Sequence, residues 1–389
     1  MKRVLFSLVS ILVILTALLP AAVSAEENKS LDLADNAESA VLMERDSGKI
    51  MFEKNADKEL PPASMTKIMT MLLVMEAMEN GELKMDETVR TSDYAASMGG
   101  SQIFLEPGEE MTVRDLLKGV AIASGNDASV ALAERVAGSE DAFVEQMNKR
   151  AKELGLKNSA FKNVTGLPAE GHYSSANDMA VIAKELLKYD KVIEFTGTYE
   201  DYLREDTDKK FWLVNTNRLV KFYPGVDGLK TGYTNEAKYC LTATAKRDGM
   251  RVIAVVMGAP TPKERNRQVS KMLDYAFNRY ETHQLYEQGK KIGEVPIIKG
   301  DRRYADLVTA EPISLLTKKG EKTDDIKTEV KVPQGLQAPL EKGSKAGKLI
   351  FTKNGEVVLE KDLVVKEEIK TASWLDLFKR NMSWFGGQK

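Results

Sequence analysis

Residues 62–81 read PASMTKIMTMLLVMEAMENG, and this stretch decides the fold. Between Ile68 and Met78 nearly every residue is apolar, and Gly81 follows as a helix stop signal. A helix without a polar face must be surrounded by protein, and this run is too short to cross a bilayer. The stretch therefore predicts a helix from Ser64 to Asn80 that runs through the middle of a core.

Strand patterns occur on both sides of this helix in the chain. Two pairs of short apolar segments each enclose a glycine-containing turn, which is typical of a β-hairpin. The pairs are Ala40–Met43 with Ile50–Phe52, and Tyr239–Ala245 with Arg251–Gly258. Helical patterns over Val113–Ala137, Ala142–Leu154, Asn177–Tyr189 and about Lys263–Tyr280 account for much of the rest. For residues 26–282 we expect a mixed α+β domain: one antiparallel sheet built from both ends, packed by helices, with a helical insertion between its strands.

The sequence pattern changes after His283. Short alternating segments are separated there by Gly, Pro and charged clusters, which favours a small all-β domain over residues 283–368. The segments are Lys291–Ile298, Ile326–Val332, Ala346–Lys353 and Glu356–Val365.

The last residues, 369–389, carry an amphipathic pattern. A helix over Thr371–Phe385 would have one aromatic and apolar face and one polar face that includes Lys379 and Arg380. The apolar face would hold Trp374, Leu377, Phe378, Met382 and Phe385. Such a helix is typical of a membrane surface, and the alternative is a terminal helix docked on the β domain or on another subunit.

The first 25 residues resemble a targeting segment. Lys2 and Arg3 precede an apolar run from Val4 to about Leu19, and Val23–Ala25 supplies the small residues of a cleavage site. We expect residues 1–25 to be a signal peptide, with an uncleaved membrane anchor as the alternative. Either way, we expect the bulk of the chain to be exported.

The composition of the chain argues against nucleic acid as a partner and against a metal cofactor. The chain has 389 residues and a formal net charge of -2, so it has no excess of positive charge for nucleic acid. Its one cysteine, Cys240, excludes an intramolecular disulfide. Cys240, His172 and His283 are too scattered to form a zinc site without several carboxylates, so we expect no metal and no other cofactor.

Three short motifs follow one another along the chain. They are Ser64-Met65-Thr66-Lys67, Ser124-Gly125-Asn126 and Lys230-Thr231-Gly232. Each is weak alone, because a second S-x-x-K occurs at Ser159–Lys162 and a second S-x-N at Ser175–Asn177. Context separates the first set: the serine at 64 starts the buried helix, the serine at 124 ends another helix, and the lysine at 230 opens a predicted strand.

Ser64 and Lys67 have the spacing of a nucleophile and its base. A separation of three on a helix places both side chains on one face. A serine hydroxyl needs a base, and a lysine serves only if its pKa falls well below about 10.4. Burial and a second cation both act in that direction, and Lys230 is the obvious second cation. The alternatives are a lysine that reaches solvent or pairs with a buried acid, and a serine that only caps the helix.

These motifs resemble those of the penicillin-recognising serine enzymes, whose S-x-x-K, S-x-N and K-T-G elements line one cleft. Longer segments are similar to the low-molecular-mass D-alanyl-D-alanine carboxypeptidases. The segments span residues 62–67, 124–128, 163–167, 175–178 and 226–234. The resemblance covers about Asn36–Tyr280 and implies a fold of the β-lactamase and transpeptidase type, followed by a small β domain and an amphipathic tail.

The resemblance also implies the reaction. Ser64 would attack the penultimate D-alanine carbonyl of a peptidoglycan pentapeptide stem, and Lys67 would accept its proton. Ser124 and Asn126 would relay a proton to the leaving D-alanine and orient the substrate amide. Water would then cleave the acyl-enzyme. β-Lactam antibiotics would act as inhibitors by acylating the same serine.

The remaining residues would bind the substrate. Lys230 and Thr231 would hold the terminal carboxylate, together with Arg265, through charge-assisted hydrogen bonds. Gly232 completes the K-T-G motif. Tyr233, which stands where several family members have histidine, would contribute its backbone N–H to the oxyanion hole with that of Ser64.

Other functions are compatible with parts of this pattern. A β-lactamase of the same fold would need a deacylating glutamate in an E-x-x-L-N context, and none occurs between Ser124 and Lys230. A non-catalytic penicillin sensor or wall-binding protein would not need all the motif residues. Transpeptidase and endopeptidase activities share the acyl-enzyme and differ only in the acceptor. We expect a carboxypeptidase on the outer face of the cytoplasmic membrane, held there peripherally by the C-terminal helix.

Overall fold

The computed structural model describes residues 32–323, 325–375 and 378. The expected signal peptide, residues 1–25, lies outside the described residues, as does most of the expected helix Thr371–Phe385. Within the described part of the chain, no helix is both long enough and apolar enough to cross a membrane.

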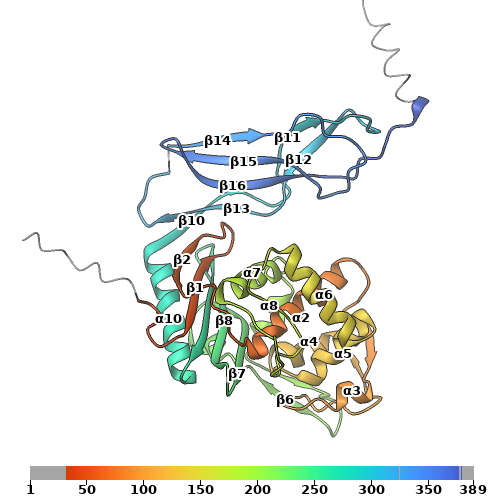
Figure 1. Ribbon diagram of the computed structural model, residues 1–389, viewed down its shortest axis with the longest axis vertical. Helices are drawn as coiled ribbons and strands as arrows, with labels where there is room; N and C mark the ends of the chain where they lie inside the picture. The colour runs from red at the N-terminus through yellow and green to blue at the C-terminus, as the bar shows by residue number, and fades with distance from the viewer. Residues whose placement is uncertain (1–31, 324, 376–377, 379–389) are drawn as a thin grey trace, which may run out of the picture. The chain divides into compact units, whose positions relative to one another are not determined.

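A five-stranded antiparallel sheet forms the centre of the first domain, with the strand order β2-β1-β9-β8-β7. The strands are β1 (Ser39–Glu44), β2 (Ile50–Lys54), β7 (Val226–Thr234), β8 (Lys238–Arg247) and β9 (Met250–Ala259). Val41 of β1 lies opposite Val255 of β9, so segments from the two ends of the domain are neighbours in the sheet (Figure 1). The expectation of one sheet built from both ends is confirmed.

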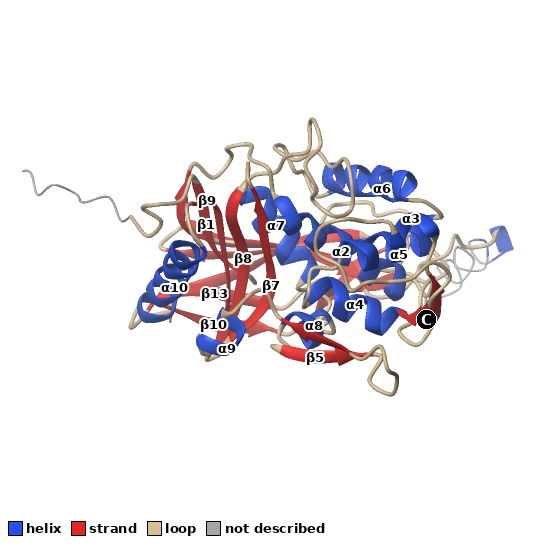
Figure 2. Cartoon of the chain, turned by 90° about the horizontal axis from the view of Figure 1, so that it is seen from below, coloured by secondary structure: helices blue, strands red, loops and turns tan. Residues whose placement is uncertain are grey.

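Helices cover both faces of this sheet, as Figure 2 shows. Helix α10 (Pro262–Arg279) packs against β8 and β9, and α7 (Ala176–Leu186) packs against β1 and β9 from the other side. Both faces are therefore dry, which explains why β1 and most of β9 are apolar without alternation. The rest of the helical insertion comprises β3 (Thr88–Arg90), α3 (Asp93–Ala96), β4 (Glu110–Thr112), α4 (Val113–Ala121), α5 (Asn126–Ala137), α6 (Glu140–Glu153), α8 (Val192–Thr196), β5 (Glu200–Leu203), β6 (Phe211–Val214) and α9 (Leu219–Phe222).

The apolar helix is buried as expected, but its first turn is different. Helix α2 (Lys67–Glu79) begins only at Lys67, and the preceding residues form a 3₁₀ turn, η1 (Ala63–Thr66). Ala63 has a φ of 48°, so the chain enters this turn through the left-handed region. The nucleophile therefore lies in the 3₁₀ turn, and Lys67 is the first residue of the α-helix that follows it.

A second sheet forms the all-β domain that follows. Its order is β11-β12-β16-β15-β14, with every neighbouring pair antiparallel. The strands are β11 (Lys291–Pro296), β12 (Tyr304–Thr309), β14 (Ile326–Lys331), β15 (Lys345–Lys353) and β16 (Glu356–Val365), and β10 (Tyr280–Tyr286) pairs separately with β13 (Ile313–Lys318). Strands β10, β12 and β13 were not expected from the sequence.

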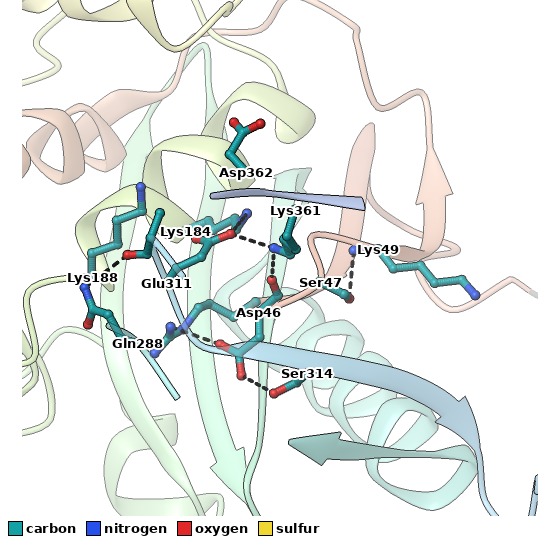
Figure 3. Close-up of polar contacts among 12 residues, drawn as sticks. Asp46, Ser47, Lys49, Lys184, Lys188, Gln288, Glu311, Ser314, Lys361 and Asp362 are labelled. Atoms are coloured by element: carbon teal, nitrogen blue, oxygen red, sulfur yellow. Dashed lines mark hydrogen bonds and ion pairs between the residues drawn. The ribbon is translucent and has the colours of Figure 1, made fainter. Parts of the chain in front are cut away.

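Polar contacts tie the β1–β2 turn to this later part of the chain (Figure 3). The ammonium group of Lys361 in β16 donates to the backbone carbonyl of Asp46 and to Glu311 Oε1, the latter at 2.6 Å. The Ser314 hydroxyl donates to Asp46 Oδ2 at 3.2 Å. Because Lys361 is only 9% exposed, these partners satisfy a charge that is almost out of contact with solvent.

Candidate active site

The three motifs meet at one cavity of about 780 Å³. Of the predicted site residues, those that line it are Ser64, Ser124, Thr231, Gly232, Tyr233 and Arg265. The other three, Lys67, Asn126 and Lys230, are buried next to it. The structure thus brings together residues that are separated by up to two hundred positions in the chain.

The Lys67 amine faces the Ser64 hydroxyl. Lys67 Nζ lies 3.1 Å from Ser64 Oγ, 2.6 Å from Asn126 Oδ1 and 2.7 Å from the backbone oxygen of Thr165. Both other partners can only accept hydrogen bonds. A neutral amine has two N–H groups and one lone pair, so donating to these two acceptors leaves the lone pair for the proton of Ser64.

The surroundings favour this neutral form. Burial lowers the pKa of Lys67 well below its ordinary value, and the nearby charge of Lys230 lowers it further, while Asp127 acts in the opposite direction. Lys67 is fully buried, and no ion pair found among the described residues involves it. The described contacts of Lys67 therefore do not include the buried acid that the alternative interpretation requires.

The S-x-N motif supplies the second wall of the site. Ser124 follows α4 with a φ of 66°, a left-handed conformation that non-glycine residues adopt only under constraint. Asn126 begins α5 and donates through Nδ2 to the backbone oxygen of Gly99 at 2.7 Å. Asp127 accepts from the backbone N–H groups of Ile103 and Leu105, which holds this loop on α5.

The K-T-G motif lies on β7, at the edge of the sheet. The motif does not open the strand, as the sequence suggested, because β7 already starts at Val226 and pairs with β8 over most of its length. Gly232 is required by the close approach of β7 to η1: a Cβ there would lie 2.7 Å from the backbone oxygen of Pro62. Without a side chain, the strand can lie directly beside the nucleophile.

Lys230 and Arg265 make this end of the cavity positive. Burial, followed by the charge of Arg265, lowers the pKa of Lys230 to about 7. Burial also lowers the pKa of Arg265 to about 10, so its guanidinium is charged at neutral pH. Arg265 is 6% exposed and donates to Asn266 Oδ1, and no carboxylate pairs with it or with Lys230 among the described residues. A cationic pocket of this kind suits a carboxylate ligand.

Several residues at the site were missed from the sequence. The Thr231 hydroxyl donates to that of Thr216 at 2.7 Å, and the ring of Tyr239 packs 4.4 Å from that of Tyr233. Ser101 and Arg218 also line the cavity. Tyr239 follows from β-hairpin register, since it lies directly opposite Tyr233. The sequence carries no comparable signal for Thr216 or for the backbone oxygen of Thr165.

A serine beside a buried lysine, an S-x-N turn and a K-T-G edge strand around one cavity define a serine hydrolase of the penicillin-recognising class. The family "D-alanyl-D-alanine carboxypeptidase" matches residues 23–261, and "Penicillin-binding protein 5, C-terminal domain" matches residues 280–371. The chain belongs to the D-alanyl-D-alanine carboxypeptidase family and is a serine-type carboxypeptidase.

Individual relatives agree with this assignment. The chain is 60% identical to the D-alanyl-D-alanine carboxypeptidase DacF of Bacillus subtilis, over 98% of each chain. Penicillin binding protein 5 from Haemophilus influenzae has a solved structure with 34% identity and a TM-score of 0.69, covering 86% of this chain and 98% of that one. Penicillin-Binding Protein D2 from Listeria monocytogenes, solved in its ampicillin-bound form, has 34% identity and a TM-score of 0.56, covering 62% of this chain and 98% of that one.

Proposed function

We propose that this carboxypeptidase removes the terminal D-alanine from peptidoglycan pentapeptide stems through an acyl-enzyme on Ser64. The observation that carries the proposal is the 3.1 Å approach of the buried Lys67 amine to the Ser64 hydroxyl. A lysine whose pKa lies far below its ordinary value can accept a proton at neutral pH.

The acylation step follows from this geometry. Lys67 takes the Ser64 proton as Oγ bonds to the penultimate D-alanine carbonyl carbon, and the backbone N–H groups of Ser64 and Tyr233 hold the oxyanion. The C–N bond breaks as Ser124 passes a proton to the leaving nitrogen. Asn126 orients the substrate amide while accepting a hydrogen bond from Lys67. Water then attacks the ester carbonyl, which releases the tetrapeptide and restores Ser64.

Substrate position is set on the other side of the cavity. The terminal carboxylate binds Thr231 and the cations Lys230 and Arg265. The outer edge of β7 has no partner strand among the described residues, so an extended peptide can add to the sheet there. β-Lactams use the same site, in keeping with the ampicillin-bound Listeria relative.

The experiment is an assay of the purified protein on L-Ala–γ-D-Glu–L-Lys–D-Ala–D-Ala. We expect the native protein to produce free D-alanine and tetrapeptide. After Ser64→Ala we expect neither covalent labelling by penicillin nor release of D-alanine. Cross-linked dimer in place of free D-alanine would assign the activity to transpeptidation, since an amine would then be the acceptor. Penicillin labelling without D-alanine release would favour a sensor.

We also propose where the enzyme works. The cationic and apolar start of the chain, residues 2–19, supports export, and the amphipathic pattern of residues 371–385 supports attachment to the outer face of the cytoplasmic membrane. Fractionation of cells that express the full chain should place it with membranes. Removal of residues 369–389 should release it into the soluble exported fraction.

A further inference from the structure

His172 is a buried histidine that the proposed reaction does not use. Its side chain bridges two segments: Nε2 lies 2.9 Å from the hydroxyl of Thr66, and Nδ1 accepts from the backbone N–H of Lys162 at 3.2 Å. The residue is 8% exposed, and its ring meets that of Phe161 edge-on, with centroids 5.9 Å apart.

The backbone contact determines the tautomer. Because Nδ1 accepts from the Lys162 N–H, it carries no proton, and the proton of the neutral ring is on Nε2. Nε2 therefore donates to the Thr66 hydroxyl oxygen. Burial lowers the pKa of His172 to about 4, and Lys162 contributes in the same direction, so this neutral form persists at working pH.

Thr66 is well placed to transmit the contact. It belongs to η1, between the nucleophile and the base, and its side chain is fully buried. The chain that leads to His172 touches the same turn twice more. Thr165 accepts from Lys67 Nζ at 2.7 Å, and a Cβ on Gly166 would lie 1.8 Å from the backbone oxygen of Ala63. Residues 163–172 thus pack against η1 and against the start of α2.

We propose that His172 is a positioning residue, which sets the Ser64 and Lys67 geometry by holding Thr66 in the 3₁₀ turn. The proposal rests on the role of Ser64 as nucleophile in the proposed function. His172 contacts neither of the two reacting side chains in the contacts described. It acts through Thr66, so its loss should slow formation of the acyl-enzyme more than it weakens binding.

A merely structural role is the competing explanation, and the chain offers a matched control. The Thr70 hydroxyl donates to the backbone oxygen of Val164 at 2.7 Å, also within the core and also between α2 and residues 163–172. This bond lies one helical turn farther from Ser64. Thr70→Val should therefore lower stability to a similar degree without moving the 3₁₀ turn.

The test is pre-steady-state acylation by nitrocefin, with the acylation rate constant and the initial binding constant measured separately. We expect His172→Phe and Thr66→Val each to lower the rate constant about tenfold with little change in binding. The double variant should be no slower than either single one, because both remove one contact. His172→Gln, whose amide can still donate to Thr66, and Thr66→Ser should recover most of the rate.

The Thr70→Val control and the thermal unfolding midpoints of the variants separate a positioning role from a merely structural one. Thr70→Val should acylate within about twofold of the parent, although its midpoint falls as far as that of His172→Phe. Equal slowing in Thr70→Val, or unchanged acylation in both Thr66→Val and His172→Phe, would overturn the proposal. Since nitrocefin reports Ser64 acylation directly, a parent that is acylated but releases no D-alanine from pentapeptide would refute the proposed function and leave this inference standing.

Discussion

The chain contains the S-x-x-K pattern twice, and only one copy has the surroundings of an active site. Lys67 is fully buried beside Ser64, whereas Lys162 is exposed. Ser159 is bonded to the hydroxyl of Ser174 and to Asp178 Oδ2, at 2.9 and 2.8 Å. In that copy the serine donates to a carboxylate and the lysine side chain is exposed to solvent, so the two do not form a buried pair.

An S-x-x-K motif therefore depends for its chemistry on the burial of its lysine and on a neighbouring cation. The second copy nevertheless contributes to the first. Its backbone at Lys162 holds the His172 ring, which in turn contacts Thr66 in the nucleophile turn. Substitutions made in parallel at the two copies therefore separate activation from structural support.

The largest effect is expected at the two serines. Ser64→Ala should abolish covalent labelling by a fluorescent penicillin and D-alanine release, because Ser64 carries the only hydroxyl found in contact with the Lys67 amine among the described residues. Ser159→Ala removes both hydrogen bonds of the Ser159 hydroxyl and should cost about 1–2 kcal/mol of stability, while labelling by penicillin is retained. Labelling gels and denaturant unfolding give the two readouts. Persistent labelling of Ser64→Ala would contradict the assignment.

The next largest effect concerns the two lysines. Lys67→Met should slow acylation by about 10²–10⁴-fold, the usual contribution of a general base. Lys67→Arg should not recover the rate, because a guanidinium stays protonated. Lys162→Met keeps the backbone N–H and should acylate at the parent rate. Stopped-flow acylation by nitrocefin measures all three, and a fast Lys67→Arg would exclude Lys67 as the base.

A smaller, pH-dependent effect is expected at Lys230. Its charge lowers the pKa of Lys67, so Lys230→Ala should raise that pKa and move the acid limb of the kcat/KM profile to higher pH. The substitution also removes a cation from the carboxylate pocket, so KM for the pentapeptide should rise. Profiles from pH 5 to 10 are the measurement. If Lys230→Ala left both the acid limb of the kcat/KM profile and the KM unchanged, Lys230 would neither lower the pKa of Lys67 nor bind the substrate carboxylate.

The smallest effect is on stability in acid. The pKa of His172 is about 4 in the folded chain against an ordinary value of about 6.5, so the unfolded chain binds a proton that the folded chain does not. Protonation of His172 in the unfolded chain should therefore lower the free energy of unfolding as pH falls from about 6.5 to about 4, by at most about 3 kcal/mol. Urea unfolding across this range should show a shallower pH dependence for His172→Gln. An identical slope would place the acid sensitivity elsewhere.

Local sequence patterns predicted much of the fold and the principal residues of the site. The apolar run after Lys67 predicted the buried helix, and hairpin turns predicted β1–β2 and β8–β9. Strands β10, β12 and β13 were missed because their alternation of apolar and polar residues is weak, and because β10 and β13, which pair with each other, are distant in sequence. Helix propensity also predicted an α-helix from Ser64 onward, and this was wrong for the first turn, because α2 begins only at Lys67.

Long-range packing determined what the sequence could not predict. The backbones of Gly166 and Gly232 both lie close against η1 and the residue before it. This turn is 3₁₀ rather than α-helical. The same holds for the partners of Lys67. Asn126 lay in a recognised motif, but a backbone oxygen such as that of Thr165 leaves no side-chain signature in the sequence.

The central claim is that Lys67 is neutral in the resting enzyme, and its titration tests this most directly. Protein labelled with ¹⁵N at lysine Nζ would be titrated by NMR, with Lys67→Met used to assign the Lys67 signal. We expect a pKa for Lys67 well below 10.4, and below the pH at which the enzyme works, that rises in Lys230→Ala. A pKa above the pH at which the enzyme works would contradict this, because a charged Lys67 has no lone pair to accept the proton of Ser64.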